Sequence, residues 1–220
     1  MLYIEKNSEP RELTEAKRKG LQAYDAMPSY TKKSIKEALL HEQGFLCAYC
    51  MQRVDLKSST IEHFIPQNPT NGEANDALSI DYNNMLAVCG GNTQIAKRKN
   101  DLICDKHRGN TFLTADPRNI HIIEQISYRD DGTIYSTDAD IQRDLNETLN
   151  LNCETALLKQ NRKSVLDAVK SEILKKCLDK TISKRQLENI LLKMREARNG
   201  KYIPFCGIAI WYLQKKLARF

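Results

Sequence analysis

Four cysteines in the first half of the chain have the types and spacing of metal ligands. Cys47 and Cys50 form a C-x-x-C pair, which places two thiolates on one tight turn. Cys89 follows an apolar run and precedes two glycines, and the next thiol along the chain is Cys104. We predict that these four residues bind one structural zinc ion, with residues 90–103 as an excursion between the last two ligands.

The split second half of this motif leaves alternatives open. A C-x-x-C pair can also be a redox pair, although no strand–helix pattern of the thioredoxin type surrounds this one. Asn92 stands where a second C-x-x-C pair would have its last cysteine. His107 is therefore an alternative for one of the four zinc ligands.

Glu62 and His63 lie between the two cysteine halves. On an extended segment, neighbouring side chains point to opposite faces, so one can hold a cation while the other meets a water molecule. Asn84 stands five residues before Cys89, where its amide oxygen can reach the same cation. In isolation these residues would be a hydrogen-bonded core histidine and a turn asparagine, but the flanking cysteines favour a functional site.

Taken in order, these motifs resemble the zinc-bearing HNH endonucleases, whose core is a ββα-metal finger. A narrower resemblance is to the PtuB-type HNH proteins of Septu and retron-linked antiphage systems. It rests on the opening Met1–Lys6, on the C-A-Y-C and E-H-F-x-P segments, and on the C-D-K-H-R-G-N run that begins at Cys104.

The resemblance implies a role for each residue. His63 corresponds to the general base, and Glu62, in place of the commoner Asp, to the ligand of a catalytic Mg²⁺ or Mn²⁺ ion. Asn84 corresponds to the central Asn that supports the metal site or its loop. The third HNH position falls on His107, Arg108 or Asp105. The resemblance also implies a nucleic-acid substrate, DNA by default and RNA (including tRNA) as the runner-up, and a PtuA-type ATPase partner.

These residue types suit phosphodiester hydrolysis. The reaction needs an activated water, a cation that neutralises phosphate charge, and help for the leaving oxygen. An imidazole with a pKa of about 6.5 can accept a proton from water at neutral pH. A carboxylate with an amide oxygen leaves a hard cation mostly hydrated and open to phosphate, whereas a four-cysteine zinc site has no open position and is structural.

Composition and charge limit the remaining possibilities. The chain has 220 residues, 41% hydrophobic and 28% charged, as in ordinary soluble proteins of one or two domains. Neither an apolar run long enough to cross a membrane nor a signal-peptide pattern is present, so we expect a cytoplasmic protein without membrane contact. Seven cysteines in such a protein favour metal ligands and free thiols over disulfides.

The C-terminal part is the basic part of the chain. Residues 139–220 carry 17 Lys and Arg against 9 Asp and Glu, whereas residues 1–138 carry 17 against 19. This basic region can follow a phosphate backbone, or it can be the solvated face of ordinary helices. In the finger region, the basic exception is the run Lys97-Arg98-Lys99.

Periodicity and turn signals predict an α+β fold, with the ββα-metal finger embedded in a mainly helical protein. We expect strands at 2–4, 121–128 and 133–135, a helix at 29–42, a long helix capped by Asn152, a helix after a Ser183–Gln186 capping box, and a last helix at 205–217. The expected regions are 1–46, which packs on the finger, the HNH domain with its following hairpin at 47–137, and the basic helical region at 138–220.

Two functional classes fit this sequence. The first is a metal-dependent endonuclease whose active site is the finger. The second is a zinc-stabilised module that binds nucleic acid or protein without catalysis. Glu62, His63 and Asn84 favour the first class, because a purely structural zinc knuckle does not need them.

Overall fold

The computed structural model describes residues 1–69, 76–177 and 181–220. It contains helices and small antiparallel sheets, which confirms the predicted α+β class. Strand β1 (Ser59–His63) pairs with β2 (Met85–Cys89), and β3 (Ile126–Tyr128) pairs with β4 (Ile134–Ser136). The longer helices are α1 (Arg11–Arg18), α2 (Ser29–Glu42), α7 (Leu158–Lys176), α8 (Lys184–Arg195) and α9 (Cys206–Leu217). Shorter helices are α3 (Asp76–Ser79), α4 (Cys104–Arg108), α5 (Ile120–Glu124) and α6 (Ala139–Arg143), with single turns at Tyr82–Asn84 and Lys99–Asp101 and a π-helical turn at Asp144–Thr148.

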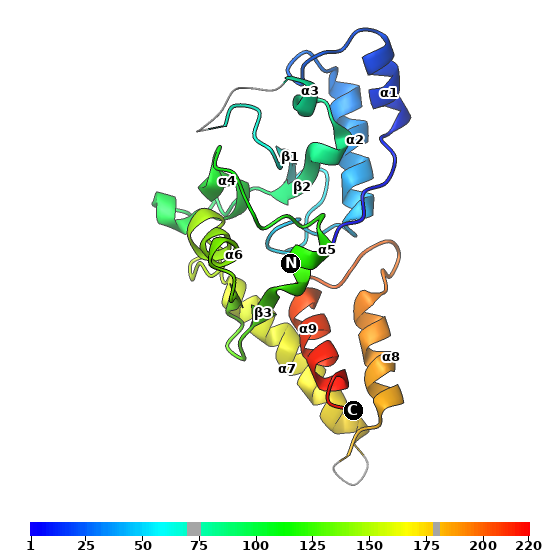
Figure 1. The fold of residues 1–220 in the computed structure, drawn as a ribbon, viewed down its shortest axis with the longest axis vertical. Helices are drawn as coiled ribbons and strands as arrows, with labels where there is room; N and C mark the ends of the chain where they lie inside the picture. Colours follow the sequence, from blue (N-terminus) through cyan, green and yellow to red (C-terminus); the bar gives the residue numbers. More distant parts are fainter. Residues whose placement is uncertain (70–75, 178–180) are drawn as a thin grey trace.

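The β1–β2 hairpin lies at the centre of the site-bearing part of the protein. Helix α2 covers it on one side, and the short helix α4 packs against β2 (Figure 1). Every residue of β2 is buried, so it is a central element rather than a solvent-exposed edge. The register pairs Glu62 with Leu86 and Ser59 with Cys89. The hairpin therefore carries a cysteine at one end and the Glu-His pair at the other.

The basic region from residue 139 shares its core with the rest of the chain. Leu145 and Leu149, which follow α6, and Phe205, before α9, belong to the same buried cluster as the hairpin. A second cluster joins α7, α8 and α9, which lie together away from the hairpin (Figure 1). Helix α9 also packs against β3.

Several predicted helices are confirmed, and each was predicted from residues that are neighbours in the sequence. Helix α2 occupies the predicted 29–42. Ser183 and Gln186 form the predicted capping box at the start of α8, where the Ser183 hydroxyl accepts from the Gln186 N–H. The last helix begins at Cys206, one residue after its predicted start.

Other predictions were wrong for identifiable reasons. Residues 2–4 form no strand within the described part of the chain, where the Ile4 N–H donates to the Pro117 carbonyl at 2.8 Å. The segment 121–128 divides into α5 and β3, because the Asn119 side chain caps a helical turn by accepting from the His121 N–H. The return strand β4 begins one residue later than predicted.

Asn152 does not cap the long helix, which begins at Leu158. Its side chain instead bridges to β4, accepting from the Ile134 N–H at 3.0 Å and donating to the Ile134 carbonyl at 2.9 Å. None of the described helices combines the length and the apolar character that a membrane span requires.

Candidate functional site

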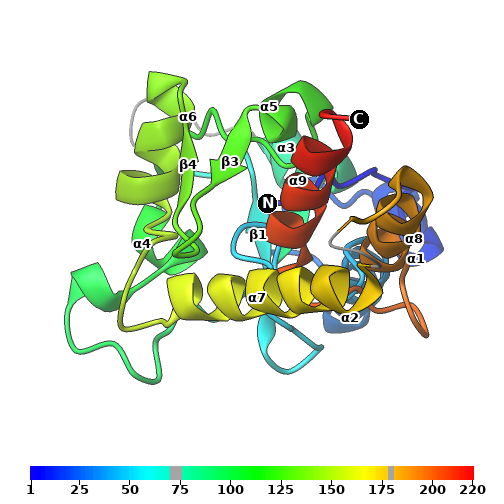
Figure 2. The same cartoon turned by 90° about the horizontal axis from the view of Figure 1, so that it is seen from below.

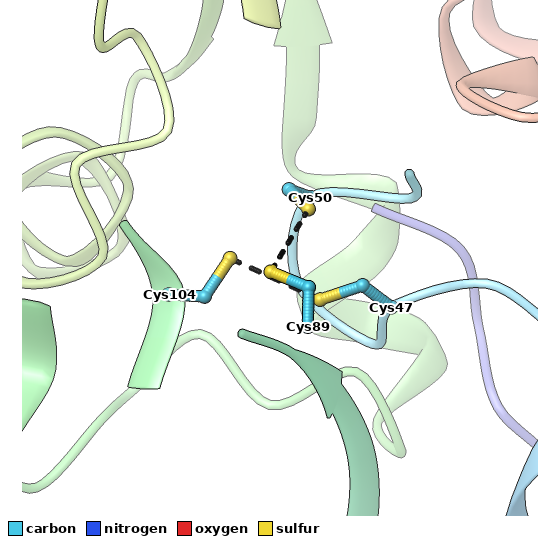
Figure 3. Close-up of side chains that lie close together, drawn as sticks. All are labelled: Cys47, Cys50, Cys89 and Cys104. Carbon is cyan, nitrogen blue, oxygen red and sulfur yellow. Dashed lines mark hydrogen bonds between the residues drawn. The ribbon is translucent and has the colours of Figure 1, made fainter. Parts of the chain in front are cut away.

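The four predicted cysteine ligands meet in one buried cluster (Figure 3). The Sγ atoms of Cys47 and Cys104 are 3.9 Å apart, as are those of Cys50 and Cys89. All four sulfurs lie within 4.8 Å of one another. Tetrahedral zinc with Zn–S bonds of about 2.3 Å places its sulfurs about 3.8 Å apart, so the donor set fits a metal ion such as zinc.

Three different elements bring these thiols together. The turn after α2 carries Cys47 and Cys50, closed by the Met51 N–H donating to the Cys47 carbonyl at 3.0 Å. Cys89 ends strand β2, and Cys104 begins helix α4 with a positive φ of 54°. The Cys104 N–H donates to the Leu149 carbonyl at 2.9 Å, which ties this ligand to the helical region.

The four thiols are free and buried. Burial raises the pKa of Cys50 and Cys104 well above its usual value. For Cys47 burial acts in the same direction, but hydrogen bonds from the other three thiols outweigh it and lower the pKa. Four buried thiols cannot all ionise without a compensating charge, which a bound dication would supply.

His107 lies outside this cluster. Its Nδ1 atom is 3.0 Å from the Thr148 carbonyl, and its side chain is half-buried. The four cysteines therefore account for a complete tetrahedral set without the histidine that sequence left as an alternative ligand.

His63, the last residue of β1, is held through both ring nitrogens. Its Nε2 atom is 2.9 Å from the Ser79 carbonyl, and its Nδ1 atom is 2.9 Å from the Gln67 amide nitrogen. A carbonyl can only accept, so Nε2 carries the hydrogen and Nδ1 presents its lone pair. Tyr24 packs edge-on against the imidazole, with ring centroids 4.9 Å apart.

The electrostatics of His63 suit a neutral base. Burial lowers the pKa of the imidazole, while the hydrogen bond to Ser79 and the carboxylates of Asp105 and Asp25 act in the opposite direction. The ring is therefore uncharged at neutral pH, with Nδ1 able to accept a proton.

Glu62 lies beside a buried group of polar side chains. The Tyr49 hydroxyl donates to Glu62 Oε1 at 3.3 Å, and the Arg108 guanidinium forms an ion pair with the same oxygen. Burial is the largest influence on this carboxyl and, with the neighbouring Asp105, raises its pKa to about 8 against the lowering effect of Arg108. A divalent cation bound beside these two carboxyl groups would favour the ionised form of Glu62.

The three candidates for the third HNH position all lie on helix α4, but they have different contacts. Arg108 contacts Glu62 directly, and the carboxyl of Asp105 is close enough to raise the Glu62 pKa. His107 points to the Thr148 carbonyl instead. Of the three candidates, Arg108 and Asp105 lie near Glu62. Arg108 is a cation, so Asp105 is the one of these two that can bind a metal ion.

Asn84 braces the loop that follows β1. Its side-chain oxygen accepts from the Ile65 N–H at 2.7 Å, and its side-chain nitrogen donates to the carbonyls of Ile65 at 2.9 Å and Leu78 at 3.1 Å. Both ends of the amide are therefore occupied by backbone groups next to His63. This arrangement suits a residue that supports the loop of the site.

Replacing Asn84 with alanine is expected to lower the free energy of unfolding by about 1–3 kcal/mol, because it removes the side-chain hydrogen bonds of the half-buried Ile65 N–H and carbonyl. Urea denaturation of Asn84→Ala and of the matched variant Asn83→Ala measures this, since the neighbouring Asn83 is exposed. Equal stability of the two variants would exclude the bracing role.

Several residues of the site were not singled out from the sequence. Tyr49 is the third letter of C-A-Y-C, and its tyrosine hydroxyl was a usable signal. Gln67, four residues after His63, and Tyr24 and Ser79, which precede and follow it at a distance, carry no local pattern that marks them.

Comparison with known proteins does not assign the chain to a family. No protein-family model matches the sequence, and no curated protein matches it.

Proposed function

We propose that the protein is a metal-dependent HNH-type endonuclease that hydrolyses phosphodiester bonds of nucleic acid, with DNA as the favoured substrate. The observation that carries the proposal is the pairing of a neutral His63, fixed through Nε2, with the Glu62–Asp105 carboxyl pair. The order β1, β2, α4 around the cysteine cluster agrees with the ββα-metal finger that the sequence resembles.

His63 would act as the general base. Once the Gln67 amide moves away from Nδ1, a water molecule in its place would give its proton to that nitrogen, while the water oxygen attacks phosphorus. The bond from phosphorus to one ester oxygen breaks, and that oxygen leaves with the electron pair. The Ser79 carbonyl keeps the imidazole in the required tautomer and holds the resulting imidazolium.

Glu62 and Asp105 would hold a hard divalent cation such as Mg²⁺ or Mn²⁺. Bound there, the cation would neutralise charge on the phosphate. The donor set fits, because carboxylate oxygens are the ligands these ions prefer. Arg108 and Tyr49 would orient the Glu62 carboxylate, since both donate to it.

The Glu62→Gln variant is expected to lose cleavage by about 100-fold or more at limiting Mg²⁺, because it removes a ligand charge while keeping the side-chain shape. Excess Mn²⁺ should recover part of the rate, since mass action fills a weakened site. Glu124→Gln, at an exposed position on α5, is the matched control. The measurement is cleavage of supercoiled plasmid and of total RNA across a metal titration.

Equal rates for Glu62→Gln and the control throughout the titration would count against this metal site. Cleavage of RNA but not of DNA would keep the mechanism and change the substrate. Binding of nucleic acid with no cleavage by freshly purified protein would favour the non-catalytic binding module.

The resemblance to PtuB-type proteins adds a partner to this proposal, an ATPase encoded alongside that would gate the nuclease in phage defence. Its support is the sequence motifs alone. Co-expression with the neighbouring gene, followed by co-purification and by cleavage assays with and without ATP, tests it.

A further inference from the structure

We propose that the loop between β2 and α4, residues 90–103, is a preformed contact for the phosphate backbone of the nucleic-acid substrate. This basic loop presents Lys97, Arg98 and Lys99 to solvent. The inference rests on the proposed nuclease function and adds the surface by which the substrate is held. It assigns this role to the loop rather than to the more strongly charged helical region.

The base of the basic loop is clamped. Cys89 and Cys104, which flank it, both belong to the metal cluster. The Ile103 N–H donates to the Gly91 carbonyl at 3.1 Å, which joins the two ends. Gly91 has a positive φ of 67°, and a Cβ there would lie 2.4 Å from the Lys106 side chain, so the close approach to α4 requires glycine.

The interior of the loop is organised by a buried carboxylate. Asp101 accepts from the Lys97 N–H at 3.1 Å and from the Arg98 N–H at 3.0 Å. The Asn92 amide donates to the Asp101 carbonyl at 2.8 Å. The backbone at the basic residues is therefore fixed before any ligand binds.

A second brace comes from the segment that leads into α7. The Asn150 side chain donates to the carbonyls of Asn100 and Leu102, each at 2.9 Å. Figure 2 shows the loop extending from the body of the protein beside this segment. A long loop held at its base, interior and flank presents its side chains at a low entropic cost.

The charges on the loop are available to a ligand. Arg98 is 3.9 Å from the Asp101 carboxylate, but its side chain remains 81% exposed. Within the described part of the chain, Lys97 and Lys99 form no ion pair with a carboxylate. Three adjacent cations on a fixed backbone match the closely spaced charges of a nucleic-acid strand.

The position of the loop links it to the proposed chemistry. It leads directly into α4, whose Asp105 and Arg108 lie beside Glu62. By contrast, several lysines of the helical region are already paired with carboxylates, including Lys170 with Asp130 at 3.1 Å and Lys176 with Glu172 at 2.9 Å. The loop therefore offers free charge next to the helix that carries Asp105 and Arg108.

The test compares two triple variants that remove the same net charge. One is Lys97→Ala/Arg98→Ala/Lys99→Ala, and the other is Lys175→Ala/Lys184→Ala/Arg185→Ala at exposed positions on α7 and α8, at the far end of the molecule (Figure 1). Both are made in a His63→Ala background, so that substrate is not consumed. Fluorescence anisotropy with a labelled DNA duplex gives Kd between 50 and roughly 200 mM salt, the range over which counterion release is large.

The loop variant is expected to bind about 10-fold or more weakly, and its salt slope should fall by about one for each lost phosphate contact. The control should stay close to the background protein. A charge-preserving variant, Lys97→Arg/Lys99→Arg, should bind as the background does. Zinc content and thermal melting are measured for each protein.

Equal losses in both triple variants would overturn the inference, because they would show dependence on overall charge alone. Normal DNA binding by the loop variant would also overturn it. If that variant instead lost binding to an acidic protein partner, the loop would be a protein-binding surface. If wild-type protein cleaves while the loop variant binds normally, the loop role falls and the nuclease stands. If wild-type protein neither binds nor cleaves nucleic acid, both proposals fall.

Discussion

Replacing Cys47 with serine is expected to release the metal and unfold the part of the protein around the β1–β2 hairpin. The ligand turn is itself core, because residues 46–51 are all buried. Structural zinc sites contribute about 10–16 kcal/mol of apparent binding free energy, and whole domains have a net stability of about 5–15 kcal/mol. Loss of the ion therefore removes a free energy comparable to the whole stability.

Elemental analysis measures this outcome directly, with about one zinc per chain expected for wild-type protein and none for Cys47→Ser. Circular dichroism melting reports the accompanying loss of structure. Cys177→Ser is the matched control, because its thiol lies at the end of α7 outside the cluster and is only half-buried. Wild-type protein that is fully folded and contains no metal would contradict the assignment.

The cysteine cluster could be predicted because its information is largely local. A C-x-x-C turn needs only its own residues, and Cys89 is placed by the apolar strand that it ends. Cys104 was the harder ligand, since fourteen residues separate it from Cys89. The Ile103 to Gly91 hydrogen bond brings the two ends of that excursion together, so chain distance did not limit the pairing.

The acid–base group could be predicted only in part. Neighbours on a strand point to opposite faces, so Glu62 and His63 were assigned separate roles from sequence. Their partners lie far along the chain, however, and no period relates Arg108 to Glu62 or Tyr24 to His63. In a helix as short as α4 each residue points in a different direction, so only the structure distinguishes Asp105 and Arg108 from His107.

The errors in predicting helices and strands from the sequence have a related cause. Residues 121–128 have the composition of a strand, but one capping side chain at Asn119 is enough to begin a helical turn there. Asn152 has the chemistry of a cap, but its hydrogen bonds to Ile134 and the guanidinium of the buried Arg162 use that side chain in tertiary contacts. In both cases a polar side chain had two possible uses, and its sequence neighbours did not determine which one the fold adopts.

The His63→Ala variant is expected to lose about 10²–10⁴-fold in cleavage rate, the usual contribution of a positioned general base. Zinc content and nucleic-acid binding should remain, because the imidazole touches neither the cysteine cluster nor the basic loop in the contacts it makes with Ser79, Gln67 and Tyr24. His121→Ala is the matched control, since that imidazole is 84% exposed on α5. Single-turnover cleavage at saturating Mg²⁺ separates a loss of chemistry from a loss of binding. Undiminished cleavage by freshly purified His63→Ala protein, with contaminating nuclease excluded by a mock purification, would overturn the proposed mechanism, because His63 is its general base.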